Sequence, residues 1–545
     1  MVERALSGAA PLNSGADPVL GDEALPFLLE DYAGIATWAG KPIYNHDQVI
    51  GQLDSGRIIA GKTITFTFLD TPRPVGIYNN PTYGLTEPGG YTPFSAAQRE
   101  VAREAMELWD DLIPQSIVEK KGVGADIVFA NTTTGPAQAH AYYPGKGVKV
   151  QSDIWTATPE ANWTNLWLDF NGYGRTTLVH EAGHALGLTH PGDYDFGDDN
   201  DGDGEPDPIT YEGDAFYAQD TMQFSIMSYF SPQKSGAQPV HTELGLVGYA
   251  QTPLLHDILA IQSKYGADPT TRAGATTYGF NSNAGNEVYD FEVNRSPFLS
   301  IYDAGGIDTL DLSGADASVF LDLRPGAFSS AGVRPTLEEA NAITEAFNAV
   351  TDADQGDFEL WTQADWDAFL TNIGNIGHNR VLADTGVSGV FALSHRNISI
   401  AYNTVIENAT GGSARDYLVG NHVGNVLMGL GGNDVLNGLE GNDTLYGGTG
   451  LDEFRFTETG GNDLIADYAA GERVNVSEID ANVATAANEA FVQAASFTGV
   501  AGQMVRSFDA GANLTTFAFD TNGDAAADMV IRINGDVAVG AAWLL

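Results

Sequence analysis

The sequence predicts an α+β domain followed by an all-β domain, which is built as a parallel β-roll and interrupted by a small helical insertion. Three observations lead to this prediction. Helix and strand patterns mix up to about residue 266, and a nine-residue repeat fills part of the second half. Two further helical patterns lie between about residues 332 and 393. The length of 545 residues also favours more than one domain.

The composition is that of a globular protein with a strongly acidic surface. Hydrophobic residues make up 43% of the chain, whereas 25 Lys and Arg face 72 Asp and Glu, giving a formal net charge of −47. This charge disfavours nucleic acids and anionic membranes as partners. The absence of Cys excludes disulfides and Cys-based zinc sites. Because no apolar stretch suits a transmembrane helix or an h-region, we expect neither membrane insertion nor an N-terminal signal peptide.

The first half reads as a leader followed by mixed helices and strands. Residues 1–25 are small, Pro-containing and acidic, which predicts a leader or short pro-segment. Ser95 and Gln98 form a capping-box signature at the start of a helix that ends before Pro114. Strands are expected at 58–69, 126–130 and 138–143, and further helices at 175–186 and 253–265, the last one ended by Gly266. The domains are therefore placed at 26–266 and 267–545.

The helical insertion at about 332–393 is predicted from two capped helical patterns. Thr336 with Glu339 opens the first pattern, and Thr362 with Asp365 opens the second. After these helices the strand-like pattern of the second half continues.

A nine-residue repeat runs from Gly411 and predicts calcium binding. Its sixth position holds Asp416, Asn425, Asp434, Asp443 and Asp452, and its eighth holds Leu418, Leu427, Leu436, Leu445 and Phe454. Glycines allow tight turns, the carboxylate faces the turn, and the apolar residue points inward from a short strand. Each unit thus supplies half a calcium cage, so the units must stack. A flexible linker is the alternative, but a linker does not keep a fixed apolar position.

The segment HEAGHALGLTH contains His180, Glu181, His184, Gly187 and His190 in the pattern HExxHxxGxxH. On a helix, the first two histidines lie one turn apart and bind one Zn²⁺, and the glycine lets the chain turn to bring in the third. The glutamate is suited to take a proton from a zinc-bound water. A closed structural zinc site would give that glutamate no role. We therefore expect one catalytic zinc ion and hydrolysis of an amide bond.

Three segments resemble the serralysins, a metzincin family of secreted bacterial zinc proteases: HEAGHALGLTHPGDYD, QFSIMSYF and LLHDILAIQSKYGAD. The resemblance runs from about residue 60 to the C-terminus, with the helical insertion as its main break. It implies a metzincin catalytic domain in which His180, His184 and His190 bind zinc and Glu181 is the general base. Met227 would form the turn beneath the metal. Tyr229 would be a further zinc ligand that swings away and stabilises the oxyanion.

The resemblance also implies further ligands and partners. A calcium site in IYDAGGIDTLDLSG would take its ligands from Arg272, Gly274, Thr276, Asp303, Gly306, Asp308 and Glu407, the first three through backbone oxygens. The strand AQAHAYYPG resembles the edge to which an extended peptide substrate adds. The expected protein is a monomeric, extracellular endopeptidase. Its expected partners are a type I secretion machinery, which exports it, and a proteinaceous inhibitor, which binds it. Its calcium-stabilised roll would support folding and export.

Several readings stay open at this point. The acidic loops 198–207 and 520–528 have partial calcium-loop spacing, but Thr210 replaces a closing Glu in the first and Ala525 replaces a Gly in the second. A structural or adhesive surface protein with a vestigial protease domain is an alternative that the intact zinc motif disfavours. A metal-dependent glycanase or esterase is another, and the Met-turn segment counts against it. Cleavage specificity does not follow from the sequence.

Overall fold

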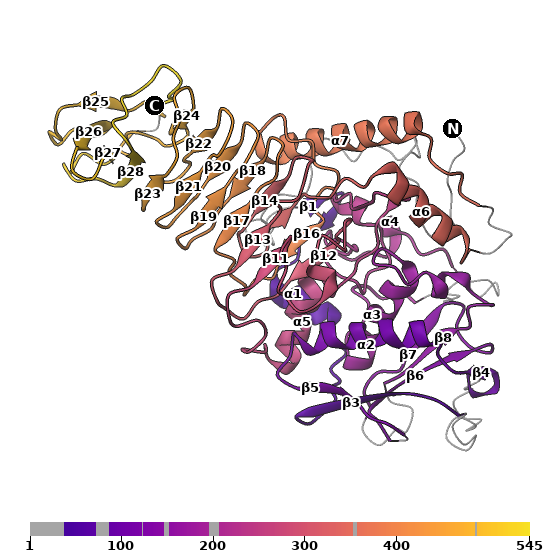
Figure 1. Ribbon diagram of the computed structural model, residues 1–545. Coiled ribbons are helices and arrows are strands. Elements are labelled where there is room, and N and C mark those ends of the chain that lie inside the picture. The colour runs from indigo at the N-terminus through magenta and orange to yellow at the C-terminus, as the bar shows by residue number, and fades with distance from the viewer. Residues whose placement is uncertain are drawn as a thin grey trace.

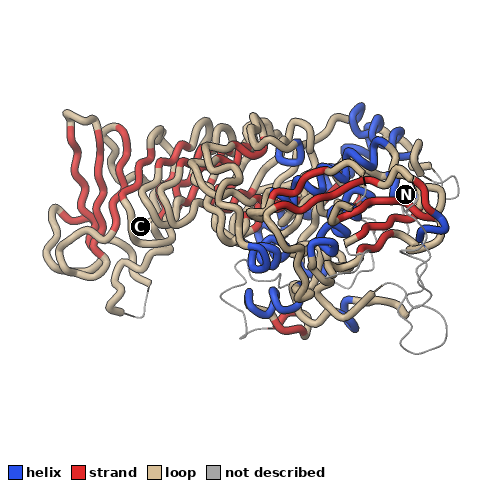
Figure 2. The backbone as a smooth tube through the Cα atoms, turned by 90° about the horizontal axis from the view of Figure 1, so that it is seen from below, coloured by secondary structure: helices blue, strands red, loops and turns tan. Residues whose placement is uncertain are grey.

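The computed structural model describes residues 37–71, 87–122, 124–145, 152–195, 207–351, 357–485 and 488–545. The leader expected at 1–25 and the acidic loop before Asp207 lie outside these residues. In the part of the chain described, helices gather at one end of an elongated molecule and short strands run toward the C-terminal end (Figures 1 and 2). No helix within these ranges is long and apolar enough to cross a membrane.

A six-stranded sheet organises the first half. Its strand order is β5-β3-β6-β8-β7, with β4 paired to β6. The strands are β3 (Thr63–Phe68), β4 (Tyr91–Thr92), β5 (Ser116–Glu119), β6 (Ile127–Thr132), β7 (Ala139–Ala141) and β8 (Asp153–Ala157). β7 is antiparallel to β8 and forms one edge of the sheet. The strand predicted at 58–69 is shorter than expected, because the chain joins the sheet only after Gly61, which has a φ of 130°.

Helices pack on this sheet and on one another. They are α1 (His46–Leu53), α2 (Ala96–Asp110), α3 (Tyr173–Leu186), α4 (Tyr211–Asp214) and α5 (Leu255–Tyr265). The predicted capping box of α2 is present, with the Gln98 amide donating to Ser95 Oγ at 3.2 Å. Trp109 of α2 is fully buried, and its Nε1 donates to the carbonyl of Val179 in α3 at 3.0 Å. This contact fixes α2 against α3.

In the second half, successive strands join two parallel sheets alternately. One sheet contains β11 (Thr277–Gly279), β13 (Thr309–Asp311), β17 (Asn408–Thr410), β19 (Val426–Met428), β21 (Thr444–Tyr446) and β23 (Asn462–Ile465). The other contains β14 (Phe320–Asp322), β18 (Tyr417–Val419), β20 (Val435–Asn437), β22 (Glu453–Arg455) and β24 (Arg473–Asn475). Leu418 lies opposite Leu436, and Leu427 lies opposite Leu445, so strands of one sheet are offset by two nine-residue units. All four leucines are fully buried, so the eighth position of the repeat supplies the core between the two sheets.

The parallel arrangement does not extend to the C-terminus. β26 (Gln503–Asp509), β27 (Leu514–Asp520) and β28 (Met529–Asn534) pair antiparallel, and β28 joins the end of the first parallel sheet. β25 (Val492–Ala494) lies at the far edge. These strands alternate apolar and polar residues and lack the glycine repeat. A tight turn that includes Asn513, with a φ of 52°, links β26 to β27 as a hairpin. The alternating parallel pairing therefore ends at β24, and the predicted parallel roll does not extend over the C-terminal strands.

Smaller sheets lie within each half. They are formed by β1 (Thr37–Trp38) with β2 (Lys41–Pro42), β9 (Val240–His241) with β10 (Leu246–Val247), and β12 (Leu299–Ile301) with β16 (Ile398–Ile400) and β15 (Phe328–Ser329). One hydrophobic cluster continues from the first half into the parallel sheets.

The two helices predicted between 332 and 393 are α6 (Leu337–Asn348) and α7 (Gln363–Thr385), and both begin at the expected caps. Phe347 of α6 packs on Trp167, with ring centroids 4.9 Å apart. α7 lies along the early strands of the parallel sheets in Figure 1, and its Val381 belongs to the same buried cluster as Tyr417 of β18. The helices thus contact both halves of the molecule.

A buried ion cluster fixes α7. Asp384 contacts His395 Nε2 and Arg396 Nη2, each at 2.8 Å, and all three side chains are at most 3% exposed. His395 Nδ1 and Arg380 Nη1 both approach the carbonyl of Gly236, at 3.1 and 2.9 Å. This cluster ties the end of α7 to the segment that follows Tyr229.

Candidate metal and active site

Helix α3 presents the first two histidines of the zinc motif. It ends at Gly187, which has a φ of 104° and donates its amide to the carbonyl of His184 at 2.9 Å. A side chain at this position would collide with the carbonyl of Arg57 and would force an unfavourable left-handed backbone. The glycine therefore permits the sharp turn that returns the chain to the metal site at His190.

The three histidine side chains converge. The Nε2 atoms of His180 and His184 are 3.1 Å apart, those of His184 and His190 are 3.0 Å apart, and those of His190 and His180 are 3.4 Å apart. Three ligands on a tetrahedral zinc ion with Zn–N bonds of about 2.05 Å would lie about 3.3 Å from one another. The residues present therefore fit a zinc ion.

The second nitrogen of each ring sets the tautomer. The Nδ1 atoms of His180, His184 and His190 lie 2.8, 2.8 and 2.9 Å from the carbonyls of Ile226, Leu188 and Tyr194. A carbonyl only accepts, so each Nδ1 carries the hydrogen and each Nε2 keeps its lone pair for a metal. Burial, with the neighbouring His190, lowers the pKa of His180 to about 3 and holds the pKa of His184 well below its usual range. The rings of His180 and His184 are thus neutral ligands.

Glu181 is a buried acid next to this cluster. Its side chain is 5% exposed, and Oε2 has no hydrogen-bond partner among the residues that the structure describes. Burial, with a smaller contribution from Asp195, raises the pKa of Glu181 to about 8. An unpaired carboxyl group is free to exchange a proton with a bound reactant.

The segment around Met227 lies beneath the histidines. A Cβ added at Gly183 of α3 would come within 2.7 Å of Met227 Sδ, so this glycine allows the turn to approach the helix. Asp257 of α5 holds the turn, accepting from Ser225 Oγ at 2.6 Å and from the Ile226 amide at 2.7 Å. Burial raises the pKa of Asp257 to about 6. The sequence alone does not give Asp257 a role, although a single acid on the apolar side of a predicted helix indicates a buried partner.

Tyr229 lies beside the triad. Its ring centroid is 4.4 Å from that of His190 and 6.0 Å from that of His180, and the side chain is 37% exposed. Burial of the hydroxyl, with the charge of Glu181, raises the pKa of Tyr229 above its usual range. The phenol is therefore protonated at neutral pH and can donate a hydrogen bond.

Edge strand β7 passes the metal site. It contacts α3, and the ring of Tyr143, just beyond it, lies 5.6 Å from the ring of His184. Glu87 accepts from the hydroxyl of Tyr142 at 2.5 Å and contacts His140 Nε2 at 2.9 Å, which fixes the side chains around the strand. β7 pairs only with β8 among the described strands, so its outer edge is open to another strand.

The aspartates of the repeat are buried in the turns of the parallel sheets. Asp434 Oδ1 accepts from the Asp416 amide, and Asp452 Oδ1 accepts from the Asp434 amide, both at 2.8 Å. Oδ2 of Asp434, Asp443 and Asp452 has no partner within the described stretches, although these side chains are at most 1% exposed. Burial and neighbouring carboxylates raise the pKa of Asp434 to about 8 and that of Asp443 to about 7. Oxygen atoms in this state suit a hard cation.

The repeat glycines make room for these carboxylates. A Cβ at Gly411 would lie 2.6 Å from an oxygen of Asp416, and Gly429, Gly438 and Gly447 meet Asp434, Asp443 and Asp452 in the same way. The first position of the unit therefore excludes any side chain.

The second set of predicted calcium ligands also comes together. Asp308 Oδ1 accepts from the Thr276 amide, and Glu407 accepts from the Asp308 amide, both at 2.7 Å. Asp308 Oδ2 has no partner in the described chain. Gly306 approaches the carbonyl of Gly274 so closely that a Cβ would collide with it.

The remaining predicted ligands lie around this group. Asp303 accepts from Tyr278 at 2.7 Å, and Thr276 Oγ1 lies 3.2 Å from the carbonyl oxygen of Arg272. The guanidinium of Arg272 pairs with Asp111 at 2.6 Å, and its Nε donates to the hydroxyl of Tyr278 at 3.0 Å.

The acidic loop 520–528 is held by its own hydrogen bonds. Asp520 accepts from the Gly523 amide at 2.6 Å, and Asp528 accepts from the Thr521 amide at 2.7 Å. Ala525 takes a φ of 67°, the conformation for which a glycine is usual. Oxygens of Asp520 and Asp528 thus accept hydrogen bonds from the loop itself.

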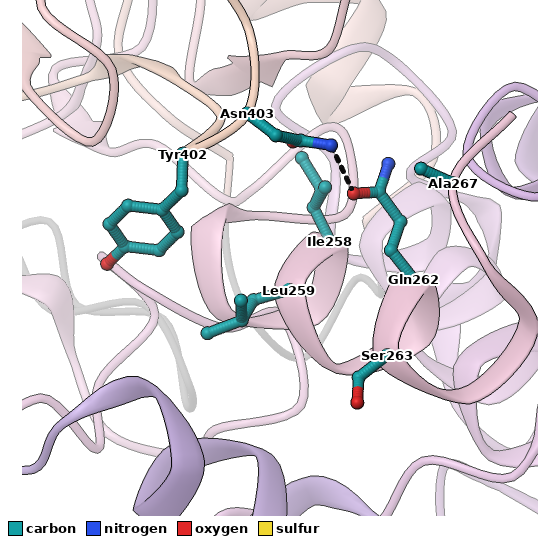
Figure 3. A pocket seen from close by; sticks show the side chains of 7 residues that line it. All are labelled: Ile258, Leu259, Gln262, Ser263, Ala267, Tyr402 and Asn403. Carbon is teal, nitrogen blue, oxygen red and sulfur yellow. Dashed lines mark hydrogen bonds between the residues drawn. The ribbon is translucent and has the colours of Figure 1, made fainter. Parts of the chain in front are cut away.

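A small hollow of about 230 Å³ lies beside α5 and is lined by Ile258, Leu259, Gln262, Ser263, Ala267, Tyr402 and Asn403 (Figure 3). Asn403 Nδ2 donates to Gln262 Oε1 at 3.0 Å. Because none of the lining residues belongs to the metal sites, we assign the hollow no function.

The chain is similar to one protein family along most of its length. Residues 267–351 and 339–544 match the family model described as Peptidase M10 serralysin C terminal. The chain is 35% identical over 532 residues to Metallopeptidase AprA of Pseudomonas marginalis, covering 94% of this chain and 93% of that protein. It is 33% identical to Serralysin G of Dickeya chrysanthemi, covering 91% and 90%. It is also 32% identical to Serralysin of Photorhabdus luminescens, covering 80% and 76%.

Proposed function

Since the chain belongs to the serralysin family of metalloendopeptidases, we propose that it is a secreted enzyme that hydrolyses extracellular proteins at a zinc ion held by His180, His184 and His190. The observation that carries the proposal is the convergence of three Nε2 atoms beside Glu181, a buried acid whose Oε2 has no hydrogen-bond partner in the described residues. A purely structural zinc site would not need this acid. An adhesive protein with a vestigial protease domain would not need to keep the geometry.

The site residues divide the reaction between them. When bound, zinc supplies a Lewis acid that polarises the scissile carbonyl and lowers the pKa of water. Glu181 accepts a proton from the attacking water and returns it to the leaving amine. Tyr229, which is protonated and lies at the rim of the triad, donates a hydrogen bond to the oxyanion. The Nδ1 hydrogens of the three histidines remain on backbone carbonyls throughout, so each Nε2 would stay available to the metal.

The substrate binds as an added strand. The open edge of β7 offers backbone donors and acceptors to an extended peptide, and the strand passes the metal site at Tyr143. Backbone pairing of this kind is tolerant of sequence, so the side-chain contacts on either side of the metal decide which peptides are cleaved.

The parallel sheets would bind several calcium ions through Asp416, Asp434, Asp443 and Asp452, with a further ion at Asp303, Asp308 and Glu407. The buried, unpartnered Oδ2 atoms support this part of the proposal. Extracellular calcium modules bind at about 10⁻⁴–10⁻³ M, above cytosolic levels, so the sheets would form only after export. A chain exported in this way by a type I machinery would fold outside the cell.

Casein hydrolysis tests the proposed function. With calcium held in excess, 1,10-phenanthroline should abolish cleavage, and one equivalent of zinc should restore it, because the histidines alone supply no Lewis acid. His184→Ala should fail to recover under the same treatment. Peptidase activity that survives zinc removal, or a zinc-loaded chain that cleaves esters or glycans but no peptides, would overturn the proposal.

Tyr229→Phe should keep the fold and zinc but lower kcat by about 10²-fold, the usual effect of removing one oxyanion donor. KM should change much less, because the hydroxyl acts mainly in the transition state. Steady-state kinetics on a fluorogenic peptide give both constants. A change confined to KM would assign Tyr229 to substrate binding instead.

A further inference from the structure

A second buried acid, Asp220, lies behind the metal site and is used by none of the steps above. It follows α4 and precedes the Met227 segment, and its side chain is 0% exposed. Its Oδ1 accepts two hydrogen bonds, from the hydroxyl of Tyr194 at 2.8 Å and from Oγ of Ser228 at 2.7 Å. These two donors come from separate segments of the site.

The Tyr194 contact leads to the third histidine. The Tyr194 carbonyl accepts the Nδ1 hydrogen of His190 at 2.9 Å, and the two rings stack with an interplanar angle of 10° and centroids 5.5 Å apart. Tyr194 is 5% exposed, so its hydroxyl has no ready exchange with water. Fixing the Tyr194 side chain therefore fixes the backbone group that orients the His190 ring.

The Ser228 contact leads to Tyr229. Ser228 directly precedes Tyr229, is 2% exposed, and also accepts from the Phe230 amide at 3.2 Å through its Oγ. The hydroxyl thus links Asp220 to the backbone on both sides of the tyrosine. The Tyr194 and Tyr229 ring centroids lie 5.3 Å apart, so the two segments also approach each other through these rings.

We infer that Asp220 is a positioning residue that sets the spacing between His190 and Tyr229 by holding Tyr194 and Ser228 on one carboxylate oxygen. The inference rests on the proposed zinc peptidase function. One oxygen with two donors holds both segments to a common point, whereas separate acceptors would let them move independently. Loss of the acid should loosen both the third metal ligand and the tyrosine.

The test separates the two contacts. Tyr194→Phe should speed zinc release to a chelator about tenfold, which corresponds to about 1.4 kcal/mol, and should affect kcat less. Ser228→Ala should lower kcat about tenfold and affect zinc release less. Asp220→Ala should do both, and Asp220→Asn should recover most of both, because its amide oxygen still accepts from two hydroxyls. Zinc release is followed with a colorimetric chelator and kcat with a fluorogenic peptide, in excess calcium.

Tyr211→Phe is the matched control, since its buried hydroxyl belongs to the same cluster as Tyr194 but donates to the Ala218 carbonyl, at 2.9 Å, and not to Asp220. It should change neither readout by more than about twofold. Wild-type protein without bound zinc would refute the proposed function itself. Wild-type zinc binding, with Asp220→Ala matching the control in both readouts, would refute only the role of Asp220. If Asp220→Ala does not fold, equal effects of Tyr194→Phe and Ser228→Ala on both readouts would also refute it.

Discussion

Glu181→Ala should bind zinc as the wild type does and lose about 10²–10⁴-fold in kcat, the range for removal of a positioned general acid or base. The histidine nitrogens that form the metal site do not depend on Glu181, and the carboxyl group has no hydrogen-bond partner to lose within the described residues. The fold should therefore persist. Zinc content by mass spectrometry and turnover of a fluorogenic peptide measure the two effects separately.

The exposed Glu338 of α6 offers a control, since Glu338→Ala removes the same group far from the metal ligands. It should leave kcat and zinc content at wild-type values. Glu181→Gln should be as inactive as Glu181→Ala, because an amide cannot take up the proton. Near-wild-type turnover of either Glu181 variant would remove the general base from the mechanism.

Removal of calcium should unfold the parallel sheets of the full-length protein. Without a cation, Asp434 is buried next to Asp416 and Asp452, and Asp443 is buried next to Asp463. Oδ2 of Asp434, Asp443 and Asp452 has no partner in the described residues, and burial of such groups costs several kcal/mol. Each turn buries only a few apolar side chains, which cannot offset this cost and the chain entropy. Far-UV circular dichroism should lose β signal in a calcium chelator and regain it as calcium reaches about 1 mM.

Asp434→Asn serves as the internal comparison. The amide removes one charge but keeps an oxygen for the Asp416 amide, so the variant should need more calcium to fold but should lose less structure in chelator. Asp524→Asn, in the loop held by its own backbone, should fold at the same calcium concentration as the wild type. If the protein is equally folded with chelator and with millimolar calcium, the repeat is structural in its own right and calcium-dependent folding after export must be abandoned.

Local periodicity explains what could be predicted. His180 and His184 lie one turn apart on a single helix. Leu418 and Leu427 lie nine residues apart, in neighbouring units of the repeat. Such patterns are visible without knowing the fold. α1 was missed although Asn45 and Gln48 form a capping box, because its eight residues bury few apolar side chains.

Long-range partners could not be predicted. Asp257 holds the turn at Ile226, and Asp220 holds Tyr194, across 31 and 26 residues of chain. A lone Asp in an apolar segment shows that a partner exists, but only the folded backbone shows which amide or hydroxyl it is. The antiparallel end of the second half was missed for a related reason, since strand direction depends on which neighbour a strand meets.

The offset between carboxylates and turns gives the parallel sheets a polarity. The turn at Asp416 is completed by Asp434, and the turn at Asp434 by Asp452, so every turn depends on a residue that is synthesised later. A chain cut within the repeats would lack the carboxylates that accept from the amides of its last two turns. Those turns would then be less ordered and would stabilise the preceding turns less. We therefore expect the folded region to grow from the strands next to β24 toward the N-terminus.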